Sequence, residues 1–428
     1  MKKSLIIIIV MVICTACSEK EQAVVSPSDY TKFSQEKITL LEKSNLDREL
    51  DFWNKKIKND SVQLSALASA ANVYNQLFKE TNNIGYLKNA ERCLEKAYDV
   101  AAVKKESFAI ALAQNYITQH RFKDAKKVLL PYEAMTSVSA LQYVLFDINM
   151  ELGNYSKAEV NLNNFRNLSD FNYLIRVAKY SDYKGDLSST IRYMEKALKK
   201  AKSANNRSLL LWAYTNLGDY YGHDGRIEES YDCYTKALAI APDNMYAKKA
   251  IAWILYSHEK KPAEALTMLE NATKGRRAPD HFLLMSEIAK AVQNNEKSIA
   301  YLEAYQQLTS NSEYGVMYDH HNALALIDNY NNPIKGKELA KKEVANRPTP
   351  ASYALLAYAT LKNGDKEKAL ELANEFVMNK TYEPAAQLII AQIYKANNLD
   401  EKASQLKKEL IGAAFELGPS YEKEILKL

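Results

Sequence analysis

The chain has 428 residues, with only 12 glycines and 10 prolines, and its net charge is +5. Architectures built from β-hairpins consume many more turn residues, so the composition favours an all-helical protein. Charged residues make up 25% of the chain and both signs are interspersed. Such a weak and evenly mixed field argues against nucleic acid as a partner.

The first segment, residues 1–16, is predicted to be an export leader. It begins with two lysines and continues with an apolar stretch over residues 5–13, which is too short to span a bilayer as a helix. Cys17 then follows the small residues Thr15 and Ala16. This stretch resembles the lipobox of bacterial lipoproteins, although Cys14 stands where that motif usually carries leucine.

The lipobox resemblance implies cleavage before Cys17 and acylation of its thiol, with the protein held in the cell envelope. Ser18, rather than aspartate, follows Cys17, which resembles lipoproteins sorted to the outer membrane. We therefore expect attachment to that membrane, on its periplasmic face or at the cell surface. An ordinary secretory leader and an uncleaved anchor are the alternatives.

Residues 17–34 show no regular period and are predicted to form a flexible tether. Residues 35–60 carry apolar side chains near helical spacing and are expected to form capping helices, since the end of a repeat array needs covering. At the other end, residues 413–428 are expected to form a second cap, within which the pair Gly418-Pro419 breaks the last helix.

Between the caps, over residues 61–412, small residues recur at a spacing near 34. They are Ala90, Ala125, Ala158, Thr190, Ser230, Ala265, Ser298, Gly336, Ala369 and Ala403. An apolar or aromatic residue follows four positions after nine of the ten. A period of this length, carried by two helices per unit, predicts a solenoid of helical hairpins.

Residues 210–244 resemble the tetratricopeptide repeat (TPR). The matching positions are Leu217, Gly218, Tyr221, Ser230, Tyr234, Ala237 and Pro242. The resemblance implies a right-handed α-solenoid of about ten hairpins, in which the first helix of each pair lines a concave groove. In such a fold the groove binds other proteins or peptides, here those of the cell envelope.

Inward-facing positions of the TPR pattern, carried over to this chain, predict a partner-binding groove. They fall on Tyr183, Trp212, Asp219, His223, Tyr246, Trp253 and Tyr256. The register is ambiguous by one residue near Trp253. Counting from Ala265 would place this bulky side chain at a small position, whereas counting from Pro242 places Ala252 there. We adopt the second count and expect the extra residue in the loop near Pro262.

Motifs for chemistry are missing from the sequence. The six histidines have no metal-binding spacing, the glycines form no phosphate loop, and no nucleophile motif is present. We therefore predict no cofactor, no metal and no enzymatic activity. The function that the sequence favours is a lipid-anchored scaffold for protein–protein interactions. The alternative is an outer-membrane lipoprotein that binds glycans or nutrients, whose relatives of the starch-utilisation type carry long insertions that this chain lacks.

Overall fold

The computed structural model describes residues 23–26, 28, 40–57, 63–274 and 278–428. The predicted leader, Cys17 and most of the predicted tether lie outside these ranges. All regular elements within them are helices. None of these helices combines the length and the apolar character needed to cross a membrane.

The helices pair in chain order into ten hairpins. The first five are α3 (Leu64–Thr81) with α4 (Ile84–Val100), α5 (Lys105–Thr118) with α6 (Phe122–Leu129), α7 (Ser139–Glu151) with α8 (Tyr155–Asn164), α9 (Phe171–Tyr183) with α10 (Leu187–Ser203), and α11 (Arg207–His223) with α12 (Ile227–Ile240). The next five are α13 (Met245–Trp253) with α14 (Pro262–Ala272), α15 (Pro279–Ala291) with α16 (Asn295–Thr309), α17 (Asp319–Asp328) with α18 (Pro333–Asn346), α19 (Pro350–Lys362) with α20 (Lys366–Phe376), and α21 (Pro384–Ala396) with α22 (Asp400–Gly412).

The remaining elements are short or terminal. They are α2 (Leu40–Lys56), α23 (Ala414–Leu417), α24 (Pro419–Lys427) and the turns η1 (Leu130–Tyr132), η2 (Ile254–His258) and η3 (Ser312–Tyr314). The prediction of an all-α array of helical hairpins is confirmed.

Close contact between paired helices explains the small residues. All ten predicted small positions are buried. In α11, a Cβ added at Gly218 would lie 2.7 Å from Cε1 of Tyr234 on α12. The Ser230 hydroxyl donates a hydrogen bond of 2.7 Å to the Gly218 carbonyl. Large residues at these positions would separate the two helices, because interiors pack densely.

Both ends of the array are covered. Leu50 of α2 is buried against Val73 and Leu77 of α3. At the other end, Leu417 and Ile425 pack on α21 and α22. The described parts of the two predicted capping segments thus bury the apolar faces that the first and last hairpins would otherwise expose.

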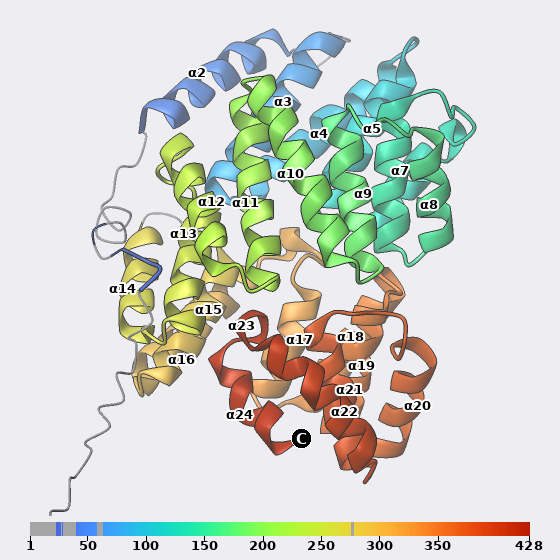
Figure 1. Ribbon diagram of the computed structural model, residues 1–428. Coiled ribbons are helices and arrows are strands. Elements are labelled where there is room, and N and C mark those ends of the chain that lie inside the picture. Colours follow the sequence, from blue (N-terminus) through green and yellow to red (C-terminus); the bar gives the residue numbers. More distant parts are fainter. Residues whose placement is uncertain (1–22, 27, 29–39, 58–62, 275–277) are drawn as a thin grey trace, which may run out of the picture.

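The array doubles back on itself, which the repeat period did not predict. Figure 1 shows α2–α12 as a first tier above a second tier of α17–α22, with α13–α16 joining them on one side. The tiers touch where the Arg347 guanidinium lies 3.3 Å from the Glu151 carboxylate. The Asn346 amide also donates to the His120 carbonyl (3.0 Å). The molecule is therefore a closed ring around a hollow.

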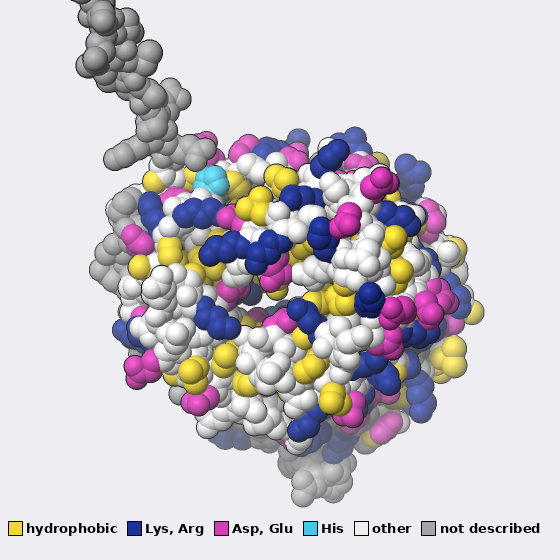
Figure 2. Space-filling model, turned by 90° about the horizontal axis from the view of Figure 1, so that it is seen from below, with side chains coloured by type: hydrophobic (Ala, Val, Ile, Leu, Met, Phe, Trp, Pro, Cys, Tyr) yellow, Lys and Arg dark blue, Asp and Glu magenta, His cyan; other side chains and the backbone are white. Residues whose placement is uncertain are grey.

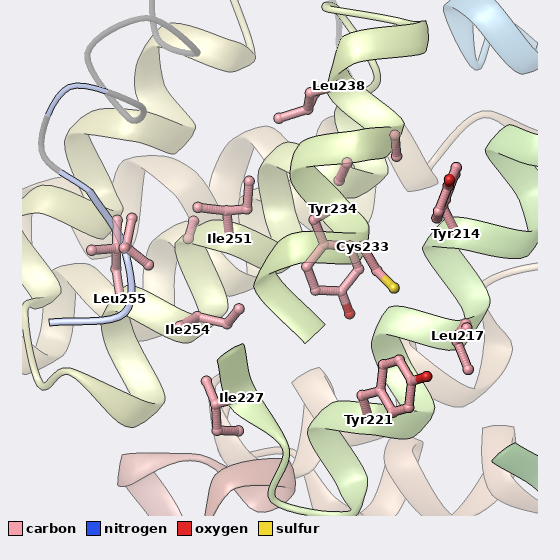
Figure 3. Packing of buried hydrophobic residues seen from close by; sticks show 14 of the residues in the cluster. Tyr214, Leu217, Tyr221, Ile227, Cys233, Tyr234, Leu238, Ile251, Ile254 and Leu255 are labelled. Carbon is pink, nitrogen blue, oxygen red and sulfur yellow. The ribbon is translucent and has the colours of Figure 1, made fainter. Parts of the chain in front are cut away.

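A short piece of the predicted tether is packed against the body. Val25 is fully buried and joins the largest apolar cluster, part of which Figure 3 shows around Leu255. Its backbone N–H donates to a carboxylate oxygen of Glu259 at 2.6 Å. The prediction of a flexible tether over residues 17–34 is therefore wrong at Val25.

Closure of the ring can be tested at Gly153. This glycine has φ +67°, and a Cβ there would lie 2.6 Å from the Pro348 carbonyl oxygen in the second tier. Gly225 has φ +74° at the equivalent turn, with nothing within 4 Å of its Cβ position. Alanine at either site is expected to cost about 1–2 kcal/mol for the left-handed backbone.

Gly153→Ala is expected to cost a further 1–3 kcal/mol or so, since a backbone carbonyl must move. Denaturant unfolding of both variants measures the difference. Equal losses of stability would show that the two tiers do not touch at Gly153.

Candidate functional site: the hollow between the tiers

The hollow between the tiers contains a cavity of about 650 Å³. Residues 150–155, 179–187 and 223, from α7 to α11, contribute its first wall, and residues from 347–351, 380–384 and 409–416 contribute the opposite wall. Figure 2 looks into the molecule from below and shows the hollow, with side chains of both charges around it. The site therefore depends on chain segments that lie about 200 residues apart in the sequence.

A compact charge network joins the two walls of this central cavity. The Lys179 ammonium lies 2.9 Å from the Glu151 carboxylate, which also faces Arg347. Burial alone would raise the pKa of Glu151, but these two cations outweigh it and hold that pKa below its ordinary value. In turn, Glu151 and Asp147 raise the pKa of Lys179 against the opposite effect of its burial. These charges are balanced within the protein.

Three other carboxylates in the cavity are less well compensated. Asp182, Glu383 and Glu416 all have raised pKa values, because the surrounding protein displaces water from them. Arg347 offsets part of this effect at Glu383, as His223 does at Glu416, 3.8 Å away. The charge of Asp182 raises the pKa of both of the others further. This part of the hollow is acidic.

A second cavity of about 310 Å³, here named the Trp253 pocket, opens beside the first. Its lining consists of Asp219, Gly222, His223, Tyr234, Tyr246, Lys249, Ala250, Trp253, Ile254, Leu284, Phe415 and Glu416. His223 and Glu416 also line the central cavity. The two cavities therefore share a wall and form one concave site.

Asp219 is the best-fixed polar group of the Trp253 pocket. The hydroxyls of Tyr234 and Tyr246 donate to its two carboxylate oxygens at 2.7 and 2.6 Å. Burial nevertheless raises the pKa of Asp219, and the two phenols reverse only part of that shift. The carboxylate is held in place by neutral donors.

Residues 413–428, here named the C-terminal arm, complete the Trp253 pocket. The Phe415 carbonyl accepts hydrogen bonds from the Trp253 indole N–H (3.0 Å) and the Ser257 hydroxyl (2.8 Å). Gly222 leaves room for the Phe415 ring, which a Cβ would approach to 2.9 Å. The arm therefore covers the last hairpin and also crosses to the middle of the array.

A π-helical turn positions Trp253 and Tyr256. The Glu259 N–H donates to the Ile254 carbonyl, five residues earlier, at 3.0 Å. This turn, η2, absorbs the extra residue, so the prediction of an insertion near Pro262 is wrong. Ala252 is fully buried, in agreement with the register adopted for it. π-Turns often occur where a helix must present side chains at a functional site.

Five of the seven predicted groove residues line the joined cavities: Tyr183, Asp219, His223, Tyr246 and Trp253. Trp212 does not; it is 39% exposed and meets Phe171 edge to face. Tyr256 is buried, and its hydroxyl contacts Glu287 and Ser420 at 3.1 and 3.2 Å. Tyr256 therefore contacts the C-terminal arm rather than open groove.

Sequence reasoning missed the residues that the second tier and the arm supply, among them Arg347, Glu383, Phe415 and Glu416. The Gly418-Pro419 pair was the available signal, because it predicts a change of chain direction after α22. That signal does not say where the chain goes next.

Known proteins resemble this chain in fold. No protein-family model and no curated protein matches the chain. Among solved structures it is similar to the human IFIT1 dimer with PPP-AAAA (TM-score 0.42, 13% identity, 86% of this chain and 94% of that one). It is also similar to yeast Tom70, with a TM-score of 0.39 and 15% identity over 84% of this chain and 97% of that one. A third similar structure is a tetratricopeptide repeat protein from Parabacteroides merdae, with a TM-score of 0.35 and 18% identity over 61% of this chain and 98% of that one. At such identities a likeness concerns the fold alone.

Proposed function

We propose that this protein is a lipid-anchored scaffold of the bacterial cell envelope, which holds a segment of a partner protein in the hollow between its tiers. The observation that carries the proposal is the pair of joined cavities of about 650 and 310 Å³. Their walls combine aromatic rings with carboxylates and cations. A polypeptide segment can carry complementary side chains for all three kinds of group, whereas sites for small ligands are mostly apolar and use only a few polar groups.

The envelope part of the proposal rests on the sequence around Cys17. The short apolar leader and the small residues before this cysteine support export and acylation. A scaffold so attached would present its hollow to proteins of the same membrane or of the adjoining compartment.

A photoreactive phenylalanine analogue at Tyr246 tests the partner-binding role in living cells. Tyr246 is 46% exposed and lines the Trp253 pocket. We expect illumination to yield one or a few specific protein adducts, because a bound segment must pass this side chain. Mass spectrometry of the adducts identifies the partner.

The control carries the same analogue at Val160, which is 58% exposed on α8 and lines neither cavity. Adducts that are identical at both sites would contradict binding in the hollow. An absence of protein adducts, with retention of the protein on immobilised oligosaccharides, would instead favour glycan binding.

A further inference from the structure

The walls of the Trp253 pocket are largely apolar. Trp253, Ile254 and Leu284 come from α13, η2 and α15, and the Phe415 ring comes from the C-terminal arm. These side chains are held in place by their own packing, since they belong to or contact the largest apolar cluster. A long aliphatic chain that packed along these side chains would cover apolar surface and leave the polar groups of the pocket in contact with water. The volume suits a single side chain and lies at the lower end of ligand pockets, about 300–1,000 Å³.

Charge in the pocket is biased toward the negative. Asp219 is fixed by two phenol hydroxyls, and Glu416 stands at the wall shared with the central cavity. Lys249 is the pocket's own ammonium, but it is drawn to the side. Its Nζ lies 3.8 Å from the Asp280 carboxylate and 5.8 Å from the centroid of the Tyr246 ring.

Burial raises the pKa of both Asp219 and Glu416, so each carboxylate would gain from a nearby positive charge. An anionic occupant would be repelled by them. A purely apolar occupant would remove water from Asp219 and give nothing in return, which is costly for a buried charge.

We propose that the Trp253 pocket receives a lysine or arginine side chain of the partner segment. The aliphatic stem would pack on Trp253 and Leu284 while the charged head reaches Asp219. Long cationic side chains combine an apolar stem with a polar tip in this way, and aromatic faces attract cations within about 6 Å. The inference rests on the proposed function and specifies which side chain the hollow recognises.

Titration calorimetry of the purified full-length protein tests this with four blocked pentapeptides, Gly-Gly-X-Gly-Gly. X is lysine, arginine, norleucine or glutamate. We expect the lysine and arginine peptides to bind on the order of tenfold or more tightly than the norleucine peptide, as charge-assisted hydrogen bonds allow. The glutamate peptide should bind most weakly.

Asp219→Asn removes the charge and keeps an acceptor for a tyrosine hydroxyl. This change is expected to weaken the binding of the lysine and arginine peptides about tenfold. The affinity for the norleucine peptide should stay the same. Glu416→Gln provides a second charge-removing variant on another wall. The matched control is Asp232→Asn on α12, whose carboxylate is exposed and pairs with Lys236 outside the pocket.

Binding of lysine and arginine no tighter than norleucine, or no binding by any peptide, would overturn the inference. So would an equal loss of all peptides in both pocket variants, because that pattern marks a structural role. If the calorimetry fails but protein adducts still form at Tyr246, the scaffold function stands and only the recognition of a cationic side chain is wrong. If no protein adducts form at Tyr246, the scaffold function itself is contradicted.

Discussion

Replacement of Cys17 by serine is expected to move the whole protein from the membrane fraction to the soluble fraction. A serine hydroxyl cannot take the thioether-linked lipid, and acyl chains hold a protein through about 0.8 kcal/mol for each buried CH₂ group. Two or three chains therefore make attachment nearly complete, and their loss makes it nearly absent. Fractionation and metabolic labelling with a fatty-acid analogue measure both effects.

Cys14→Ser is the control, since this cysteine lies before the proposed cleavage position and should leave labelling and fractionation unchanged. A Cys17→Ser protein that stays in the membrane would show that the leader is retained as an anchor, and the lipoprotein interpretation would fall.

The second large effect is expected from Gly418→Ala. Gly418 has φ +86°, and an added Cβ would lie 2.5 Å from the Cη2 atom of Trp253. Its ψ of 166° places it in a region that only glycine adopts readily. Strain of about 1–3 kcal/mol and overpacking of a similar size should together release the C-terminal arm. Hydrogen exchange is expected to rise over residues 413–428, and the Trp253 fluorescence should shift toward that of an exposed indole.

Gly364→Ala is the matched control, because Gly364 also has a positive φ, of 88°, but nothing lies within 4 Å of its Cβ position. Its exchange over residues 413–428 should equal that of the parent. Equal exchange of the arm in both variants would contradict the tight packing of Gly418 on Trp253.

The repeat period predicted the hairpins because each one depends on short-range packing. Gly218 against Tyr234 is a contact over sixteen positions, within one hairpin. Closure of the ring has no such periodic signal. It results from small rotations summed over ten hairpins and is fixed by single contacts such as Arg347 with Glu151.

The residues of the candidate site also fall into two groups, those that the repeat pattern predicts and those that it does not. Asp219, Tyr246 and Trp253 occupy inward positions that the repeat itself sets, so the sequence could identify them. Phe415 and Glu416 reach the pocket only because the arm crosses the ring. The one-residue mismatch before Ala265 was visible in the sequence, but spacing alone cannot separate a longer loop from a π-turn.

The buried Val25 bears on how far the molecule could stand from a bilayer. Only eight positions separate it from Cys17, and a fully extended chain of that length spans about 26–29 Å. If Cys17 carries the lipid, this leash is shorter than the roughly 30 Å thickness of a membrane's hydrocarbon layer. The side of the body that bears Glu259 would then stay close to the lipid headgroups, and rotation about the anchor would be restricted. Partners would then have to reach the hollow from sides of the molecule that do not face the membrane.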